Sequence, residues 1–557
     1  MLAERISRVS PRTGRLLATV LALGLGFAAA VGGSVPTAAV AASPVQVVIA
    51  VPIVVPPNQA GLISAQSLAQ YTSLQSPEGL LTRQLDAVID RPVAIAIDPM
   101  IIVSIRVLGT AAPPSATAWL ERLSSASNDI FPLAYGDADL TLITQAGGEP
   151  VASPTSFDFA LDADNFAPVP DEAQTPTPAP TADPIEPQLP AYPTTEDLLA
   201  WPYSTTDLAW PREGTVIASD LPTLADAGYG TTVLSSANVA RTGSASSMAD
   251  IDGRRVLVSD LLVSAALRDA ADAVTDDEWT AAISGLSAAI ATAGQAQPVI
   301  FVTASRSILA SSRLGETIAA LDADPLVSLV DLPVAVGASA AGASVLDQPQ
   351  DAQRVAVASA LLDAEHLERR FATVASDPLT ITAPRALEIA ALLSNGWEAN
   401  PDGWTRGTTT FFEESTALRG SVQIVTSDTP INLLADRAGL PIAVSNDLDV
   451  PVTVYITVRP STGLLSVVDP RVELVIEPHS QGKGAVPVEA ISNGVVQVAV
   501  SLTSSTGVAI GAGATSDINV QAGWETPVVV IITIVVILVF SGGIIRNVVR
   551  RRRAAND

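Results

Sequence analysis

Acidic and aromatic side chains recur directly after short apolar segments in the N-terminal half of this sequence. They are Asp98, Tyr135, Asp137, Asp139, Trp210 and Asp260. If these segments are parallel strands of a barrel, their carboxyl ends meet at one rim, where the reactive groups of such folds lie. Carboxylates at one rim could act as acid and base in glycoside hydrolysis, or hold a hard cation such as Ca²⁺ or Mg²⁺. A strand-end aspartate can instead cap the next helix, which explains Asp260 well because a helical pattern follows it.

The scarcity of histidine and cysteine excludes several other kinds of site. The chain has two histidines, His366 and His479, and no cysteine. His366 falls in a helical pattern and His479 in a turn, and both lie outside the strand-rich N-terminal region. A zinc centre needs nitrogen or sulfur ligands, and a Ser-His-Asp triad needs a histidine. We therefore predict no zinc centre, assign no metal site and no cofactor to this rim, and leave open the option that carboxylates alone hold Ca²⁺ or Mg²⁺.

The overall charge restricts the classes of partner. The 557-residue chain has a formal net charge of −27 and shows no basic patch in its N-terminal half. An acidic protein repels nucleic acid and anionic lipid headgroups. The sequence thus predicts no nucleic-acid partner.

Strand-like and helical segments alternate over residues 43–345. Most of the strand-like segments are continuous and rich in β-branched residues, which is typical of parallel strands buried on both faces. They are Val45–Val55, Val93–Asp98, Ile130–Tyr135, Asp207–Trp210, Thr232–Ser235, Arg255–Asp260, Val299–Thr303 and Val327–Leu332. The alternation predicts an α/β barrel-like domain, with a doubly wound open sheet as the alternative. A Pro-, Asp- and Thr-rich stretch at 147–193 is predicted to be a disordered insertion.

Two further domains are predicted after the barrel. Residues 346–419 carry apolar residues at helical spacing and should form a helical subdomain that packs on the barrel. From 420 to 522 the apolar period changes to two, and turn signals separate about seven short strand-like segments. This pattern is typical of an all-β, immunoglobulin-like sandwich.

Both ends of the chain carry membrane-targeting patterns. Residues 1–42 combine arginines, an apolar run and a small-residue cleavage site, which predicts a signal peptide. Residues 527–545 form an uncharged apolar run that is long enough to cross the roughly 30 Å hydrocarbon core as a transmembrane helix. The tail at 546–557 is rich in arginine, which favours the cytoplasmic side. We therefore predict a single-pass plasma-membrane protein with extracytoplasmic N-terminal domains.

Several motifs together resemble a known family. They are AIAIDPM at 94–100, FPLAYGDADL at 131–140, the WP element at 210–211, SNDLDVPVTVYITV at 445–458 and VELVIEPHSQGKGAVPVEA at 472–490. The chain resembles a membrane-anchored actinobacterial family of unknown function whose genes commonly neighbour the lipid II flippase gene. The first domain of that family is similar to glycoside hydrolase/deacetylase barrels, which implies a carbohydrate-type groove. Polysaccharide deacetylases pair strand-end aspartates with an HxxxH motif, and this chain has no such motif.

Two functional hypotheses follow from these observations. In the first, the protein belongs to the cell envelope, and its barrel binds a glycan or a cell-wall biosynthesis partner such as a lipid II flippase, without catalysis. In the second, the barrel is a carboxylate-based glycoside hydrolase that acts on cell-wall polysaccharide. We favour the first hypothesis because few aromatic residues accompany the strand-end acids.

Overall fold

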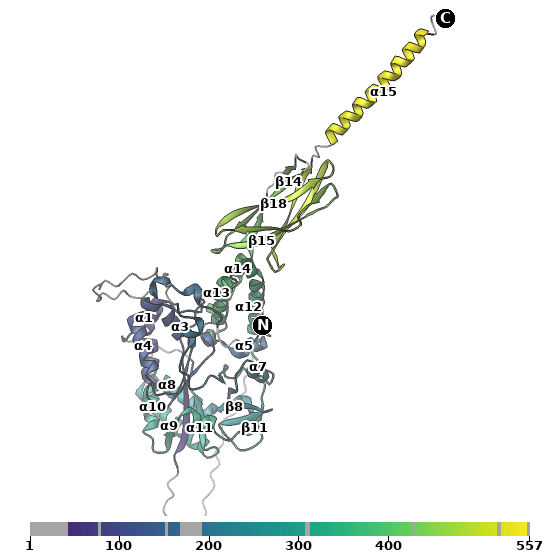
Figure 1. Ribbon diagram of the computed structural model, residues 1–557. Helices are drawn as coiled ribbons and strands as arrows, with labels where there is room; N and C mark the ends of the chain where they lie inside the picture. Colours follow the sequence, from purple (N-terminus) through teal and green to yellow (C-terminus); the bar gives the residue numbers. More distant parts are fainter. Residues whose placement is uncertain are drawn as a thin grey trace, which may run out of the picture. The chain divides into compact units, whose positions relative to one another are not determined.

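The structure is a computed structural model of the 557-residue chain (Figure 1). It describes residues 43–75, 79–150, 154–166, 192–306, 312–426, 431–433, 435, 437–520 and 525–553. The predicted signal peptide at 1–42 lies outside these residues. Within them the chain forms a mixed α/β domain, a helical region, a β-sandwich and an apolar C-terminal helix.

Seven parallel strands form the wall of the α/β domain. In spatial order they are β3 (Ile130–Pro132), β2 (Ala94–Ile97), β1 (Val45–Ile53), β9 (Val299–Thr303), β8 (Arg254–Ser259), β5 (Thr231–Ser235) and β4 (Leu208–Ala209). Each neighbouring pair in this order is parallel. A further strand, β10 (Val327–Leu329), pairs with the first residues of β1.

Helices occupy most of the connections between these strands. The longer ones are α2 (Leu80–Val88), α3 (Pro99–Val107), α4 (Pro114–Ser124), α8 (Leu261–Asp272), α9 (Asp276–Gly294) and α10 (Leu314–Asp322). The shorter ones are α1 (Ala65–Tyr71), α5 (Leu140–Gln145), α6 (Thr195–Leu199), α7 (Asp220–Asp226) and α11 (Leu332–Val336). Helix α3 begins where the sequence changes from a buried strand to Asp98-Pro99, because aspartate caps a helix N-terminus and proline fits its first turn.

The sheet curls until its two edge strands meet. Alternate side chains from the seven strands gather in one interior cluster, whereas the others pack against the outer helices. At the seam, the rings of Phe131 and Trp210 lie 6.2 Å apart between centroids. The backbone N–H of Ser204 also donates to the carbonyl of Ile130 at 2.7 Å. The predicted barrel-like domain is therefore confirmed, and the open-sheet alternative is wrong.

Three short strands beside the barrel were not predicted. They are β6 (Val239–Arg241), β7 (Met248–Ile251) and β11 (Ala341–Val345). Strand β7 pairs antiparallel with β8 across Asp252-Gly253, and both turn residues have positive φ. An Asp-Gly pair between two strands is a standard hairpin signal, so the sequence could have revealed this turn.

The prediction of disorder for 147–193 does not hold for residues 154–166. This piece forms two short 3-10 turns, and its Phe157 is fully buried. The ring of Phe157 packs 5.9 Å from that of Tyr135. The burial of one aromatic residue can offset part of the entropy that a polar segment loses on ordering. The average composition of 47 residues does not reveal such a single residue. Residues 151–153 and 167–191 lie outside the described part of the chain.

Three helices form the region after the barrel. They are α12 (Ala352–Phe371), α13 (Leu379–Leu392) and α14 (Pro401–Gly420), with the short helix η7 (Asn395–Ala399) before α14. The backbone N–H of Asp139 donates to the carbonyl of Leu393 at 2.8 Å, and Ala138 forms a β-bridge with Ser394. These contacts hold η7 beside the loop that follows β3.

Nine strands form the predicted β-sandwich. One sheet contains β12 (Val422–Val425), β14 (Arg437–Asn446), β18 (Ser480–Ala490) and β16 (Leu465–Val467). The other contains β13 (Ile431–Leu433), β20 (Ala509–Val520), β19 (Gly494–Thr503), β15 (Val452–Pro460) and β17 (Val472–Ile476). Alternate residues of β15 are buried between the sheets, which agrees with the period of two in the sequence.

The last described element is helix α15 (Glu525–Arg553), coloured yellow in Figure 1. Within it, Val528–Arg551 is long and apolar enough to cross a membrane, and none of its apolar window is buried inside the protein. Among the described helices no other has this property. The chain therefore ends in one apolar helix that could be a single membrane span.

Candidate functional site

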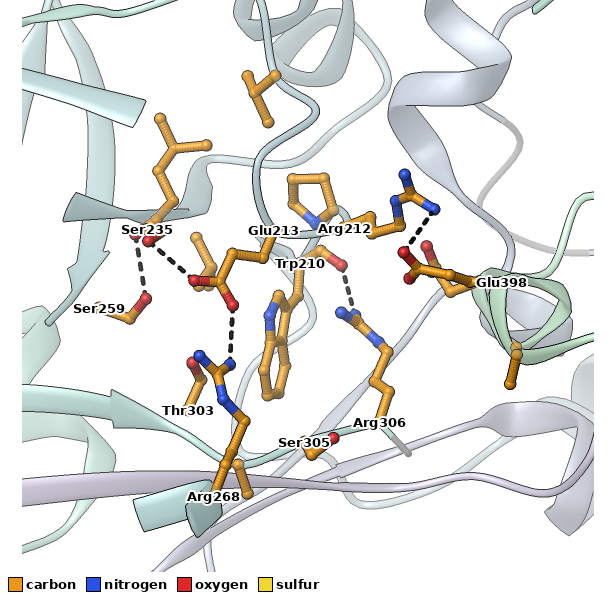
Figure 2. A pocket seen from close by; sticks show the side chains of 18 of the residues that line it. Trp210, Arg212, Glu213, Ser235, Ser259, Arg268, Thr303, Ser305, Arg306 and Glu398 are labelled. Atoms are coloured by element: carbon orange, nitrogen blue, oxygen red, sulfur yellow. Dashed lines mark hydrogen bonds and ion pairs between the residues drawn. The ribbon is translucent and has the colours of Figure 1, made fainter. Parts of the chain in front are cut away.

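A cavity of about 610 Å³ lies at the carboxyl ends of the barrel strands. Residues at or just after the ends of β4, β5, β8 and β9 line one side, and Pro56 and Pro57, which follow β1, line another. The segment 395–400, which contains η7, supplies a further wall (Figure 2). The position agrees with the general rule that barrel sites form at this end of the strands.

Trp210 and Arg306 form the centre of the cavity wall. The Arg306 guanidinium lies 4.7 Å from the centre of the Trp210 ring, and its Nη2 donates to the Trp210 carbonyl at 2.6 Å. Its Nε donates to Asp137 Oδ1 at 3.1 Å. Figure 2 shows the Trp210 ring standing between Arg306 on one side and the pair of Glu213 and Arg268 on the other. Arg306 therefore fixes Trp210 in two ways: it donates a hydrogen bond to the Trp210 carbonyl, and its guanidinium lies over the Trp210 ring.

Asp137 connects this wall to the helical region. It lies behind the cavity with 5% of its surface exposed, and its backbone has φ of 47°, directly after Gly136 with φ of 69°. Asn395 Nδ2 donates to its carbonyl at 2.9 Å and to its Oδ1 at 3.2 Å. Burial raises the pKa of Asp137, and the positive charge of Arg306 opposes that rise. This carboxyl therefore positions Arg306 and η7 instead of facing the cavity.

The two carboxylates that line the cavity both have arginine partners. Glu213 accepts from Arg268 Nη1 at 2.8 Å and from Ser235 Oγ at 3.1 Å. Glu398 Oε1 lies 3.4 Å from Arg212 Nη1. Glu213 comes from the segment after β4, and Glu398 comes from η7. The cavity wall thus consists of one aromatic ring, paired acids and bases, and small hydroxyl side chains.

The predicted rim aspartates lie elsewhere. Asp98 is 1% exposed and caps α3, accepting from the backbone N–H groups of Met100 and Gly136 at 2.9 Å each. Burial raises its pKa to about 8, and the nearby charge of Asp137 adds to this rise. Asp139 is fully buried, caps α5, and accepts from Gln350 Nε2 at 2.7 Å. Both carboxyl groups therefore hold backbone elements together inside the protein.

The remaining predicted residues divide between the cavity and the framework. Asp260 caps α8, and the Tyr135 hydroxyl donates to the Gly61 carbonyl at 2.7 Å. Trp210 lines the cavity. The prediction omitted the five charged residues of the cavity wall, Arg212, Glu213, Arg268, Arg306 and Glu398. Arg212 and Glu213 directly follow the WP element and Arg306 closely follows β9, so three of them carried a strand-end signal.

A second hollow of about 470 Å³ shares Pro56 and Pro57 with the first. Uncharged side chains line it, including Asn58, Ser67 and Tyr71. The described residues contain no group of three or more histidine, cysteine or acidic side chains that could hold a metal ion.

The fold and the cavity define a barrel protein with an open site at the strand ends, a β-sandwich, and one apolar helix that could span a membrane. The chain belongs to the DUF6049 family, a family of unknown function whose model matches residues 30–556. The comparison with curated proteins gives no match.

Several solved structures are similar to parts of the chain. The α-amylase AmyC from Thermotoga maritima matches 68% of this chain and 93% of its own, at 9% identity and a TM-score of 0.40. The alpha-2-macroglobulin of Escherichia coli, from domain MG7 to the C-terminus, matches 19% of this chain at 15% identity and a TM-score of 0.16. This chain spans 17% of the length of that structure. WR4, an MSP family member of C. elegans, matches 18% of this chain and 99% of its own, at 7% identity and a TM-score of 0.14.

Proposed function

We propose that this protein is a single-pass protein of the cell envelope whose barrel binds cell-wall glycan without cleaving it. The observation that carries this proposal is the cavity at the carboxyl ends of the barrel strands, with Trp210 and hydrogen-bonding side chains in its wall. Its volume of about 610 Å³ is typical of small-ligand sites. A sugar ring carries a rim of hydroxyl groups, and the polar side chains around the buried Trp210 ring offer hydrogen-bond partners for them.

The second hollow supports a ligand that is longer than one sugar. Both hollows have Pro56 and Pro57 in their walls, so a ligand chain that crosses these prolines would contact both. The wall of the second hollow offers amide, hydroxyl and tyrosine side chains. A linear polysaccharide has the same repeating chemistry along its length and suits such a succession of sites.

The pairing of the cavity carboxylates favours binding over hydrolysis. A glycoside hydrolase uses one carboxyl group as acid and a second as base or nucleophile. Here the two oxygens of Glu213 accept from Ser235 and Arg268, and Glu398 is paired with Arg212. In the alternative hypothesis of a hydrolase, Glu213 and Glu398 would be the reacting pair.

The proposed topology rests on helix α15 and the arginines at its end. Residues 528–545 carry no charge, and Arg546 and Arg550–Arg553 follow. Arginine clusters favour the cytoplasmic side of a span, so the barrel and the sandwich would lie outside the plasma membrane. This placement brings the barrel to the cell wall. The resemblance to proteins encoded beside a lipid II flippase agrees with a role there.

Protease treatment of intact cells from which the wall has been removed should test this topology. We expect digestion of all of the protein except a small C-terminal fragment, detected with an antibody against the tail. Cells opened by detergent serve as the control, because there the tail should also be lost. A large protected fragment would contradict the proposed orientation.

Replacement of Trp210 by leucine should weaken glycan binding at least about tenfold, because the ring holds Arg306 in place in the cavity wall. Full-length protein in detergent micelles would be sedimented with purified cell-wall polysaccharide. Trp279→Leu is the matched control, since Trp279 also lies near an arginine, Arg313 at 5.8 Å, but on the outer helix α9. Glu213→Gln is the second cavity variant. Thermal unfolding reports whether each variant folds.

Three outcomes of this experiment would decide between the hypotheses. Loss of binding in the Trp210 and Glu213 variants, with binding retained in the Trp279 control, supports the proposal. If the wild type releases soluble sugars and Glu213→Gln does not, the hydrolase hypothesis replaces the binding hypothesis. Failure of the wild type to bind any wall polysaccharide, together with co-purification of a lipid II flippase from membranes, would favour the protein-partner hypothesis.

A further inference from the structure

Three arginines line the cavity, and several of their N–H groups have no acceptor among the described residues, which indicates the chemistry of the ligand. We infer that the glycan bound there carries an anionic group, a carboxylate or a phosphate, that docks against the cavity arginines. This inference rests on the proposed function and specifies the ligand class of the same site.

Three guanidinium groups supply the donors. Arg268 uses Nη1 for Glu213, which leaves Nε and Nη2 without an acceptor among the described residues. Arg306 uses Nε and Nη2 for Asp137 and the Trp210 carbonyl, which leaves Nη1. Arg212 has its ion pair with Glu398 at 3.4 Å and no hydrogen bond within the described part of the chain. None of these nitrogen atoms is among the buried atoms without a partner, and all three arginines line the cavity.

The acceptors of the cavity wall are largely occupied. Both oxygens of Glu213 already accept hydrogen bonds, one from Ser235 and one from Arg268. Glu398 is paired with Arg212 through Oε1, and its side chain is 66% exposed. Asp137 lies behind the wall and faces Arg306 and Asn395. A ligand that enters the cavity can therefore accept from the arginine N–H groups that these carboxylates leave unused.

The cavity is much less acidic than the chain as a whole. The protein has a formal net charge of −27, yet three arginines and two glutamates line this one cavity. Guanidinium groups recognise carboxylate and phosphate oxygens through paired N–H donors, and such charge-assisted bonds are stronger than bonds to neutral hydroxyl groups. A neutral glycan would use these donors poorly, whereas an acidic sugar would satisfy them.

The test compares ligands that differ in the anionic group. Tetragalacturonate and its methyl ester provide a carboxylated chain and a neutral chain of the same length. A phosphorylated mannan tetrasaccharide and its dephosphorylated form provide the corresponding pair for phosphate. Full-length wild-type protein in detergent micelles is titrated calorimetrically with each, and we expect at least one anionic form to bind about tenfold tighter than its neutral partner.

Variants connect this preference to the cavity. Arg268→Gln and Arg212→Gln should each reduce the ratio of anionic to neutral affinity by at least about threefold. Arg122→Gln is the control, because Arg122 makes one ion pair with Asp86 at the protein surface, at 2.5 Å. Thermal unfolding confirms that each variant is folded. If one of the two cavity variants does not fold, the other still tests the inference.

The possible results separate this inference from the proposed function. Equal affinity for charged and neutral forms, with binding lost in Trp210→Leu, would overturn the anionic ligand but keep a glycan-binding cavity. A charge preference that survives both arginine variants would also overturn the inference. No binding of any probe, combined with no binding of wall polysaccharide, would overturn both proposals. Preference for one of the two anionic forms identifies the anion.

Discussion

Replacement of Arg385 by methionine is expected to destabilise the protein by about 4 kcal/mol near neutral pH, the cost of leaving buried charges without their partner. Arg385 lies in α13 and is 8% exposed. Its Nη2 donates to Glu368 at 3.2 Å, its Nη1 donates to Glu414 at 2.9 Å, and Nη1 also donates to Glu388. One guanidinium thus forms ion pairs with carboxylates from all three helices of the helical region.

The destabilisation should depend on pH. Burial raises the pKa of Glu388 to about 7, and Arg385 opposes that rise. Without the arginine, the folded state should hold protons on these carboxyls more tightly than the unfolded chain does. A folded state that binds more protons loses stability as pH rises, so the deficit should be larger at about pH 8 than at about pH 5.

Urea unfolding monitored by circular dichroism at these two pH values measures the effect. Arg369→Met is the matched control, because Arg369 is a half-exposed arginine of α12 whose ion pair with Glu365 is long, at 3.9 Å. Exposed pairs of this kind contribute less than about 1 kcal/mol. Equal losses in the two variants, or a loss in Arg385→Met that does not change with pH, would contradict the argument.

Replacement of Asp98 by asparagine should stabilise the protein at neutral pH. Asp98 is buried at the start of α3, where its ordinary pKa of 3.8 is raised to about 8. Between these values the unfolded chain has lost the proton and the folded chain keeps it, so stability falls as pH rises from about 4 to about 8. The slope is about 1.4 kcal/mol per pH unit, which gives a penalty on the order of 4 kcal/mol at pH 7.

Asparagine removes this penalty because it cannot ionise, and its side-chain oxygen can still accept from the backbone of Met100 and Gly136. We expect the variant to exceed the wild type in stability at about pH 8 and to match it at about pH 4. Asp260→Asn alters a helix cap of the same kind at a half-buried position, so it reports the effect of the cap chemistry alone. A variant that is less stable than the wild type at both pH values would show that the Asp98 carboxylate is required in its charged form.

The sequence alone determined the succession of domains. Buried parallel strands are uniform apolar runs, sandwich strands alternate, and a membrane span is a long uncharged run, because each environment imposes its own pattern of burial. Strand β9 was predicted with its observed bounds, and the buried residues of β15 follow the predicted period. These patterns are local, so neighbouring residues suffice to read them.

The tertiary structure alone decided which strand-end residues face the cavity. Asp98, Asp139 and Trp210 all follow strands, but the two aspartates turn inward to cap helices and the tryptophan lines the opening. Arg268 comes from α8, the helix after β8, and Glu398 comes from η7. Both line the cavity because the fold brings these two helices to the strand ends. The direction of a side chain at a strand end depends on hydrogen-bond partners distant in sequence, and a local pattern carries no information about them.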